Sequence, residues 1–311
     1  MKRFLFIALA LSVVLLGCQK VENTEGSSFS QENKMSVVAT IGMIGDVAAN
    51  IGGERVDVYS MMGAGVDPHL YKAKAGDLTR LNKADLILYN GIHLEAKMGD
   101  VLEKLSQTRN IKAIEDGITE EILIIVDQAH DPHIWFDVSN WMVASRVILE
   151  ALVSTDPSGE AYYRENHASY LKKLEDLDAY TKQKALTIPK ERRILITAHD
   201  AFNYFGRAYG FEVKGLQGIS TVDEAGTSDV RNLADFIAEK QIRSLFVESS
   251  VSPKSIKALQ AAVKSRGWDV AIGGELYSDA MGNAGTFEGT YIGMVTHNID
   301  TIVAGLALEE K

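Results

Sequence analysis

Four residues of this sequence carry side chains that bind transition metals, and they are widely spaced along the chain. His69 and His133 each end an Asp-Pro-His turn, and His199 and Asp279 follow much later. Proline fixes its own φ and favours an extended aspartate before it, so both turns are stiff. Imidazole nitrogens and carboxylate oxygens are common ligands of divalent transition metals. The four residues therefore indicate a metal site, provided that the fold brings them together.

The other histidines of the chain have simpler interpretations. We expect His93 to be a packed or capping residue and His130 to be a solvated loop residue. His167 and His297 lie in helical patterns and are interpreted as surface or second-layer residues. Any one of the three candidate histidine ligands, taken alone, is more often a structural or surface residue than a ligand. The two Asp-Pro-His turns in separate loops are what favours a metal site.

Carboxylates near the candidate histidines could orient their rings, because a metal-bound imidazole usually donates its other N–H to such a group. By proximity or chain position the candidates are Asp67, Asp131, Asp200 and Glu248. A turn-forming role or a salt bridge would explain each of them as well.

The elements that must position these residues follow from the hydrophobic pattern. Short β-branched runs alternate with amphipathic stretches, which predicts an α/β fold with mainly parallel sheets. We expect strands at Ser36–Ile41, Val56–Met61, Leu86–Tyr89, Ile122–Val126, Arg193–Thr197, Glu212–Leu216, Ser244–Val247 and Asp269–Ile272. Each candidate ligand follows one of these strands, and ligands of open α/β sheets bind beyond the carboxyl ends of strands. Two such lobes facing each other would place all four residues in one cleft.

A long helix is expected to join the two lobes. Leu171, Leu174 and Leu177 recur at helical spacing within residues 158–188, and Pro189 marks the end of the helix. The predicted organisation is an N-terminal lobe over 36–157, a rigid linking helix over 158–188 and a C-terminal lobe over 189–311.

The N-terminus has the pattern of a secretory signal. Lys2 and Arg3 precede an apolar run from Phe4 to Leu16, which is too short to span a membrane as a helix. The run ends at Leu15-Leu16-Gly17-Cys18, which resembles a bacterial lipobox. We expect residues 1–17 to be a signal peptide and residues 18–35 to be a lipidated Cys18 followed by a flexible tether. A cleaved signal followed by an incidental cysteine is the alternative.

Composition excludes several classes of protein. The 311 residues carry a formal charge of −10, with 46% hydrophobic and 24% charged residues, which is typical of a globular protein. The acidic balance argues against nucleic-acid binding, which needs clustered Lys and Arg. The single cysteine can form neither an internal disulfide nor a thiolate metal cage.

Six stretches of the sequence resemble the manganese- and zinc-binding lipoproteins of bacterial ABC transporters, the TroA-like family. They are GVDPHLY at 65–71, DPHIWF at 131–136, TAHDAF at 197–202, GLQGIST at 215–221, FVESSVS at 246–252 and YSDAMG at 277–282. The resemblance implies two lobes joined by one long helix, with the ion in the cleft between them. It implies that His69, His133, His199 and Asp279 are the protein ligands and that the protein, held at the membrane by its lipid, delivers the ion to a permease with a cytoplasmic ATPase. We expect it to act as a monomer.

The choice of metal is less direct. Zinc-specific members of this family often carry a long loop rich in histidine and acidic residues before the second ligand histidine, which is His133 here. In this sequence the corresponding segment, residues 122–131, is short and contains only one histidine, His130. The likeness is greatest to the manganese-binding lipoproteins, so Mn²⁺ is the expected ion. Three imidazoles and a carboxylate would also suit tetrahedral Zn²⁺, which stays the alternative.

Two functions of other classes compete with metal transport. An exported metallohydrolase would also use three histidines and a carboxylate, with Glu248 as a conceivable base, but the sequence lacks a His-Glu-x-x-His motif and a nucleophile elbow. A surface adhesin would need no metal cleft. We therefore expect a binding protein and not an enzyme.

Overall fold

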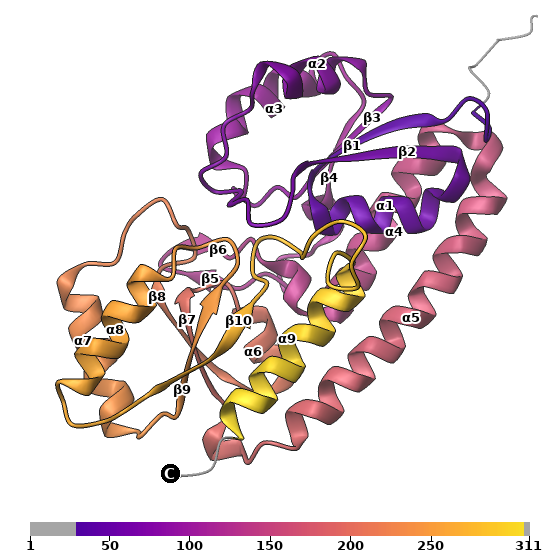
Figure 1. Cartoon of the computed structure of the whole chain (residues 1–311). Helices are drawn as coiled ribbons and strands as arrows, with labels where there is room; N and C mark the ends of the chain where they lie inside the picture. The colour runs from indigo at the N-terminus through magenta and orange to yellow at the C-terminus, as the bar shows by residue number, and fades with distance from the viewer. Residues whose placement is uncertain (1–28, 308–311) are drawn as a thin grey trace, which may run out of the picture.

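The computed structural model describes residues 29–307 of the chain (Figure 1). The predicted signal peptide, Cys18 and most of the predicted tether lie outside the described residues. Phe29, in the last part of that tether, is only 8% exposed and packs into the hydrophobic core. The folded domain therefore begins no later than Phe29.

The N-terminal lobe contains a parallel sheet in the order β2-β1-β3-β4. Its strands are β1 (Met35–Ile41), β2 (Val56–Met62), β3 (Leu86–Tyr89) and β4 (Ile111–Ala113). The helices of this part are α1 (Gly42–Gly52), α2 (Ala75–Lys83), α3 (Gly99–Ser106), η1 (Gly53–Arg55), η2 (Ala96–Met98) and η3 (Ile114–Gly117). The first three predicted strands are confirmed almost to the residue, and β4 has no counterpart among the predictions.

The expected strand Ile122–Val126 is wrong as a member of the sheet. Only β5 (Ile125–Val126) is extended, and it pairs in antiparallel fashion with β6 (Ala129–His130). Between them Asp127 and Gln128 have φ angles of 47° and 68°, which suit the tight turn of a two-residue hairpin. The fourth strand of the sheet is instead β4. It has only three residues, so its apolar pattern is too short to predict a strand.

The C-terminal lobe is built from two pairs of parallel strands. The strands β7 (Ile194–His199) and β8 (Glu212–Gln217) form one pair, and β9 (Ser244–Glu248) and β10 (Ala271–Leu276) form the other. The helices are α6 (Asn203–Tyr209), α7 (Thr227–Glu239), α8 (Lys254–Lys264), α9 (Tyr291–Leu306) and η6 (Lys190–Arg192). All four strands were predicted, but β7 and β10 run further toward their carboxyl ends, so His199 is the last residue of its strand.

Glycine is required where β8 passes the end of β7. A Cβ atom on Gly215 would lie 2.3 Å from the backbone nitrogen of Asp200, closer than atoms can approach. The residue paired with Gly215 across the two strands is Thr197. Gly215 thus lets β8 stay in register beside the strand end that carries His199.

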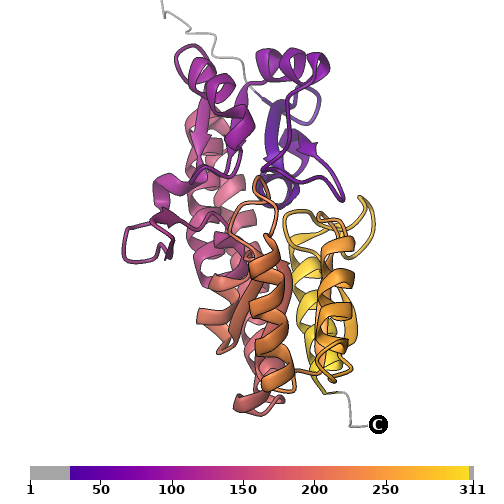
Figure 2. The same ribbon diagram turned by 90° about the vertical axis from the view of Figure 1, so that its left-hand side faces the viewer.

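One long helix runs along both lobes, as Figure 1 shows. This helix, α5 (Glu160–Leu186), has 27 residues and is about 40 Å long. It packs against α1, α9 and α4 (Val138–Thr155), and it follows the short turn η5 (Pro157–Gly159). The linking helix predicted over 158–188 is therefore present, and the expected α/β architecture with two lobes is confirmed. Figure 2 shows the lobes one above the other.

The face of α5 that packs inward is aromatic and aliphatic. Tyr163, Tyr170, Leu174 and Leu177 are each at most 4% exposed, and their spacings of seven, four and three residues place them on one face of the helix. His167 lies on the same face, 5% exposed, with Nε2 3.0 Å from the Ser145 hydroxyl of α4. His167 is thus a residue of the helix–helix contact and not of the surface.

Candidate metal centre

The structure brings His69, His133, His199 and Asp279 together. One donor atom from each residue lies within 4.8 Å of the donor atoms of the others, and all four side chains are buried. His69 lies in the loop after β2, and His133 directly precedes the turn η4 (Ile134–Phe136). His199 ends β7, and Asp279 follows β10. The two halves of the chain on either side of α5 contribute two donors each.

The three imidazole rings present the same nitrogen to one point. The Nε2 atom of His133 is 3.4 Å from that of His69 and 3.4 Å from that of His199. Nitrogen ligands at about 2.1 Å from a tetrahedral ion are separated by about 3.4 Å. The spacing therefore fits one ion at the centre of the three rings.

Asp279 completes the cluster with both carboxylate oxygens. Its Oδ1 atom lies 3.3 Å from Nε2 of His133, and its Oδ2 atom lies 3.3 Å from Nε2 of His199 and 3.8 Å from Nε2 of His69. Neither oxygen has a hydrogen-bond partner among the described residues, although the side chain is 2% exposed. A buried carboxylate needs a compensating positive charge, and this one faces the point that the three rings share.

Carboxylates behind two of the rings fix their orientation. Oδ1 of Asp131 lies 2.6 Å from Nδ1 of His133 and also accepts the backbone N–H of His133. Oε2 of Glu248 lies 2.5 Å from Nδ1 of His199, and its Oε1 accepts the backbone N–H groups of Ala198 and His199. Each Nδ1 is thereby committed to its carboxylate, which leaves Nε2 to face the centre of the cluster.

The same carboxylates set the protonation of the cluster. Burial lowers the pKa of His133, but the charges of Asp131 and Asp279 outweigh it and raise that pKa to about 9. Burial likewise opposes the charged form of His199, yet Glu248 and Asp279 raise its pKa well above the usual value. Burial would raise the pKa of Asp279, but His199 and His133 hold it well below its usual range. Without an ion, the protonated rings of His133 and His199 therefore compensate part of the negative charge of Asp131, Glu248 and Asp279.

His69 is held differently from the other two histidines. Burial lowers its pKa to about 4, because the charge of Asp279 offsets only part of the desolvation. Its backbone N–H donates to Oδ1 of Asp67 at 2.8 Å, and Oδ2 of Asp67 accepts the hydroxyl of Thr221 at 2.5 Å. Thr221 belongs to the C-terminal lobe, so this bond ties the His69 turn to the opposite lobe. No local sequence signal points to Thr221, because its partner is 154 residues away.

The remaining candidates of the sequence lie elsewhere. Asp200 accepts no bond from a ligand ring, and burial raises its pKa. His93 is exposed, and its φ angle is 59°. His130 lies on the hairpin of β5 and β6, with its Nε2 atom 3.5 Å from Oε2 of Glu120. His297 is partly buried, and its Nε2 atom lies 3.0 Å from the carbonyl oxygen of Glu275. Of the four carboxylates considered, Asp131 and Glu248 contact the rings of His133 and His199. Asp67 contacts the backbone of His69, and Asp200 contacts none of these groups.

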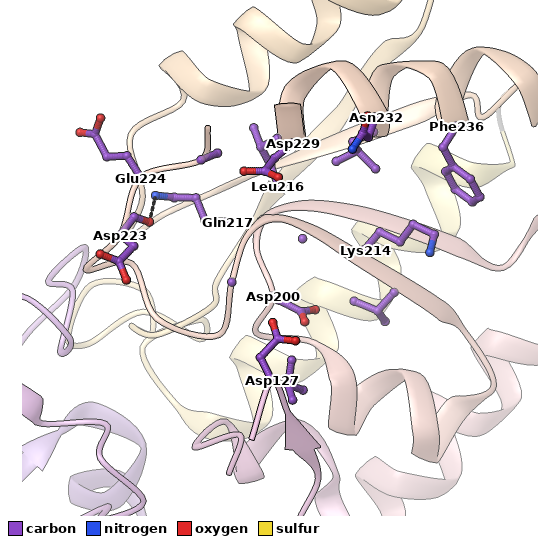
Figure 3. Close-up of a pocket in the computed structure, with 16 residues that line it drawn as sticks. Asp127, Asp200, Lys214, Leu216, Gln217, Asp223, Glu224, Asp229, Asn232 and Phe236 are labelled. Carbon is purple, nitrogen blue, oxygen red and sulfur yellow. Dashed lines mark hydrogen bonds between the residues drawn. The ribbon is translucent and has the colours of Figure 1, made fainter. Parts of the chain in front are cut away.

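A separate cavity, which Asp200 also lines, has a different lining from the cluster. It measures about 660 Å³ and runs along β8 toward α7, with Asp127, Asp200, Asp223 and Glu224 around it (Figure 3). None of the four clustered residues His69, His133, His199 and Asp279 lines it. The four donor atoms of the cluster are instead buried and lie within 4.8 Å of one another.

No helix in residues 29–307 combines the length and the apolar character that crossing a membrane requires.

Comparisons with known proteins agree with this geometry. Residues 37–305 match the family described as zinc-uptake complex component A, periplasmic. The chain is 52% identical over 277 residues to the zinc-binding protein TroA of Treponema pallidum, covering 89% of this chain and 90% of that protein. It is 46% identical over 294 residues to the manganese-binding lipoprotein MntA of Bacillus subtilis, covering 94% and 95%.

Solved structures show the same fold. The periplasmic zinc-binding protein TroA of Treponema pallidum superposes with a TM-score of 0.87, covering 88% of this chain and all of that chain, at 52% identity. A manganese-bound periplasmic metal-binding protein from Candidatus Liberibacter asiaticus has a TM-score of 0.77, covering 87% and 98%, at 27% identity. The fold, the buried cluster and the similarity along nearly the whole chain together show that this protein belongs to the zinc-uptake component A family, as a metal-binding component of an ABC transporter.

Proposed function

We propose that this protein captures Mn²⁺ outside the cytoplasm and delivers it to an ABC permease, with Cys18 lipidated as its membrane anchor. The observation that carries the proposal is the buried cluster itself. Three Nε2 atoms and both oxygens of Asp279 face one point, and these four residues, His69, His133, His199 and Asp279, are the proposed ligands. The ion is cargo, so the protein needs no reaction of its own.

The orientation of the Asp279 carboxylate supports Mn²⁺ as the bound ion. Its two oxygens approach two different histidines at equal distances of 3.3 Å, so both can reach one ion. A bidentate carboxylate with three imidazoles makes a five-coordinate site, and nitrogen and oxygen donors without thiolate suit Mn²⁺. The hairpin before His133 is also short and holds only His130, and MntA of Bacillus subtilis is a close relative.

Zinc is the second candidate, and specific observations favour it. The 3.4 Å separations of the Nε2 atoms match a tetrahedral ion, and the more similar of the two relatives compared is named a zinc-binding protein. Zn²⁺ also binds most nitrogen sites more tightly than Mn²⁺ does, so affinity in the test tube favours zinc whatever the cargo is.

Growth separates the two ions better than affinity does. A host strain lacking this gene should grow poorly when manganese is withheld, and the wild-type gene should restore growth. A gene encoding Asp279→Asn, which loses the ligand charge, should not restore it. Poor growth of the deletion strain under zinc starvation alone would identify zinc as the cargo.

The enzyme alternative loses its proposed base in this structure. Oε1 of Glu248 accepts two backbone N–H groups, and Oε2 contacts Nδ1 of His199. With both oxygens engaged and the residue 2% exposed, Glu248 cannot activate a water molecule at the ion. This supports a site that binds and releases an ion without chemistry.

The proposed anchor is tested separately. Changing Cys18→Ala should shift the protein from the membrane fraction to the soluble fraction, since acyl chains stabilise membrane attachment by about 0.8 kcal/mol for each buried CH₂ group. Mass spectrometry of the mature N-terminus would show acyl groups on Cys18 in the wild-type protein. An unmodified cysteine at that position would contradict the anchor without affecting the metal site.

A further inference from the structure

The loop that carries Asp279 is held in place by its backbone and not by its carboxylate. Within residues 29–307 the oxygens of Asp279 face only the Nε2 atoms of the three clustered histidines, at 3.3 to 3.8 Å, and have no further hydrogen-bond partner, so no side chain outside the cluster aims them at the ion. The direction of the carboxylate must therefore come from the residues just before it, Tyr277 and Ser278.

Three side chains bond to these two residues. The amide of Asn298 accepts the backbone N–H of Tyr277 at 2.9 Å and donates to its carbonyl at 2.7 Å. The hydroxyl of Ser278 lies 2.9 Å from that of Ser250. The indole N–H of Trp135 donates to the carbonyl of Ser278 at 3.1 Å. Asn298 and Ser250 belong to the same lobe as the loop, whereas Trp135 comes from the segment of His133.

Trp135 links two of the proposed ligands. It lies two residues after His133, and its ring packs edge-on against that imidazole, with centroids 5.2 Å apart. Its own carbonyl accepts the hydroxyl of Tyr291 at 2.7 Å, and the side chain is fully buried. The backbone of Trp135 is therefore held by Tyr291. Its ring contacts the imidazole of His133, and its indole N–H donates to the loop that carries Asp279.

We propose that Trp135 is a positioning residue that determines which metal the site prefers. It keeps the Asp279 loop where both carboxylate oxygens face the ion. A four-coordinate zinc site needs only one of these oxygens, whereas a five-coordinate manganese site needs both. Loss of the indole N–H lets the carboxylate turn away, which weakens the binding of Mn²⁺ more than that of Zn²⁺. The inference rests on the proposed function, because it assumes that manganese is bound through both oxygens.

The test compares two tryptophan variants of the full-length mature protein. Trp135→Phe removes the indole N–H that holds Ser278. Trp141→Phe is the matched control, because Trp141 is equally buried and its indole N–H has no hydrogen-bond partner in the described part of the chain. The dissociation constants for Mn²⁺ and Zn²⁺ are measured for each protein by competition with a chelator.

We expect Trp135→Phe to weaken Mn²⁺ binding about tenfold, in the range known for groups that orient metal ligands, and Zn²⁺ binding less than about threefold. X-ray absorption at the manganese edge should show fewer ligand atoms around the ion. Trp141→Phe should leave both the ratio of affinities and the spectrum unchanged. An unchanged ratio in Trp135→Phe, or an equal shift in Trp141→Phe, would overturn the inference.

Ser250→Ala keeps the proposal testable if Trp135→Phe does not fold. Ser250 is only partly buried, and its loss removes one bond to Ser278, so a smaller shift in the same direction is expected. No shift would count against the role of the loop. If the wild-type protein itself binds Mn²⁺ through one oxygen of Asp279, the premise of this inference fails, whereas normal growth of the deletion strain under manganese starvation would contradict the proposed function. If it uses both and the variants keep its preference, only the role of Trp135 fails.

Discussion

Glu248 holds His199 at both its ring and its backbone. One carboxylate oxygen lies 2.5 Å from Nδ1 of the imidazole, and the other accepts the N–H groups of Ala198 and His199 at 2.7 and 2.9 Å. The two residues are 49 positions apart, at the ends of β9 and β7. A single side chain thus binds the backbone at the end of β7 and leaves Nε2 of His199 to face the centre of the cluster.

Replacing Glu248→Gln should therefore weaken metal binding about 10- to 100-fold. A neutral amide can accept the ring N–H or the backbone N–H groups with its one oxygen, but not both, and it no longer makes the imidazole more basic. Competition titration with a chelator measures the loss. The control is Glu224→Gln, the same change at an exposed acid on the neighbouring cavity, which should bind metal as the wild type does. Equal affinities for all three proteins would show that Glu248 has no role.

Metal binding should release protons at neutral pH. The metal-free protein holds His133 with a pKa of about 9 and His199 with a pKa well above its usual value, whereas His69 has a pKa of about 4 and is already neutral. An ion must displace the protons of the first two rings, so affinity should rise with pH up to about 9 and fall steeply toward pH 5. Calorimetry in buffers of different ionisation enthalpy counts the protons. Identical heats in all buffers at pH 7.5 would contradict the protonated cluster.

Bound metal should stabilise the fold strongly, because its ligands come from both lobes. At a free metal concentration of 1,000 times Kd, the free energy of unfolding should rise by about 4.1 kcal/mol. Thermal unfolding followed by circular dichroism, with and without metal, measures the increase, and a chelator should reverse it. Asp279→Asn should lose most of the gain. A similar gain in that variant would place the stabilising ion elsewhere.

The turn before α5 contains an ion pair between the buried Asp156 and the partly exposed Arg55. Asp156 is 2% exposed and accepts bonds from Arg55, Ser158 and Tyr163. Burial raises its pKa, but these three partners together lower it below the usual 3.8. Since the folded pKa is the lower one, this contribution to stability is complete above pH 3.8 and is lost as the pH falls through the folded value.

Asp156→Ala should destabilise the protein by about 1–3 kcal/mol, because the buried hydroxyl of Tyr163 loses its partner and the partly exposed Arg55 loses its ion pair. Urea unfolding at pH 7 gives the value. Glu150→Ala is a suitable control, since Glu150 pairs with Arg164 at the surface of the same helix pair and its loss should hardly move the midpoint. If the two variants unfold at the same urea concentration, the ion pair at Asp156 does not hold the helix.

The pattern of apolar residues predicted the elements in which it repeats over several residues. Strands β1, β2 and β3 and the 27-residue helix α5 were expected nearly as they occur, because each carries several apolar residues at a regular period. The three residues of β4 and the hairpin of β5 and β6 were not expected. In such short segments the state of the backbone is set by the neighbouring strand or by the turn, which the local sequence does not contain.

The sequence alone determined which residues could bind a metal, since donor chemistry and the stiff Asp-Pro-His turns are local properties of His69, His133 and their neighbours. Only the tertiary structure decided that four such residues share one buried point, that Glu248 serves His199, and that Thr221 and Trp135 tie the two halves together. These relations join atoms from distant parts of the chain. They exist only because the packing of the lobes along α5 brings the ends of separate strands to one place.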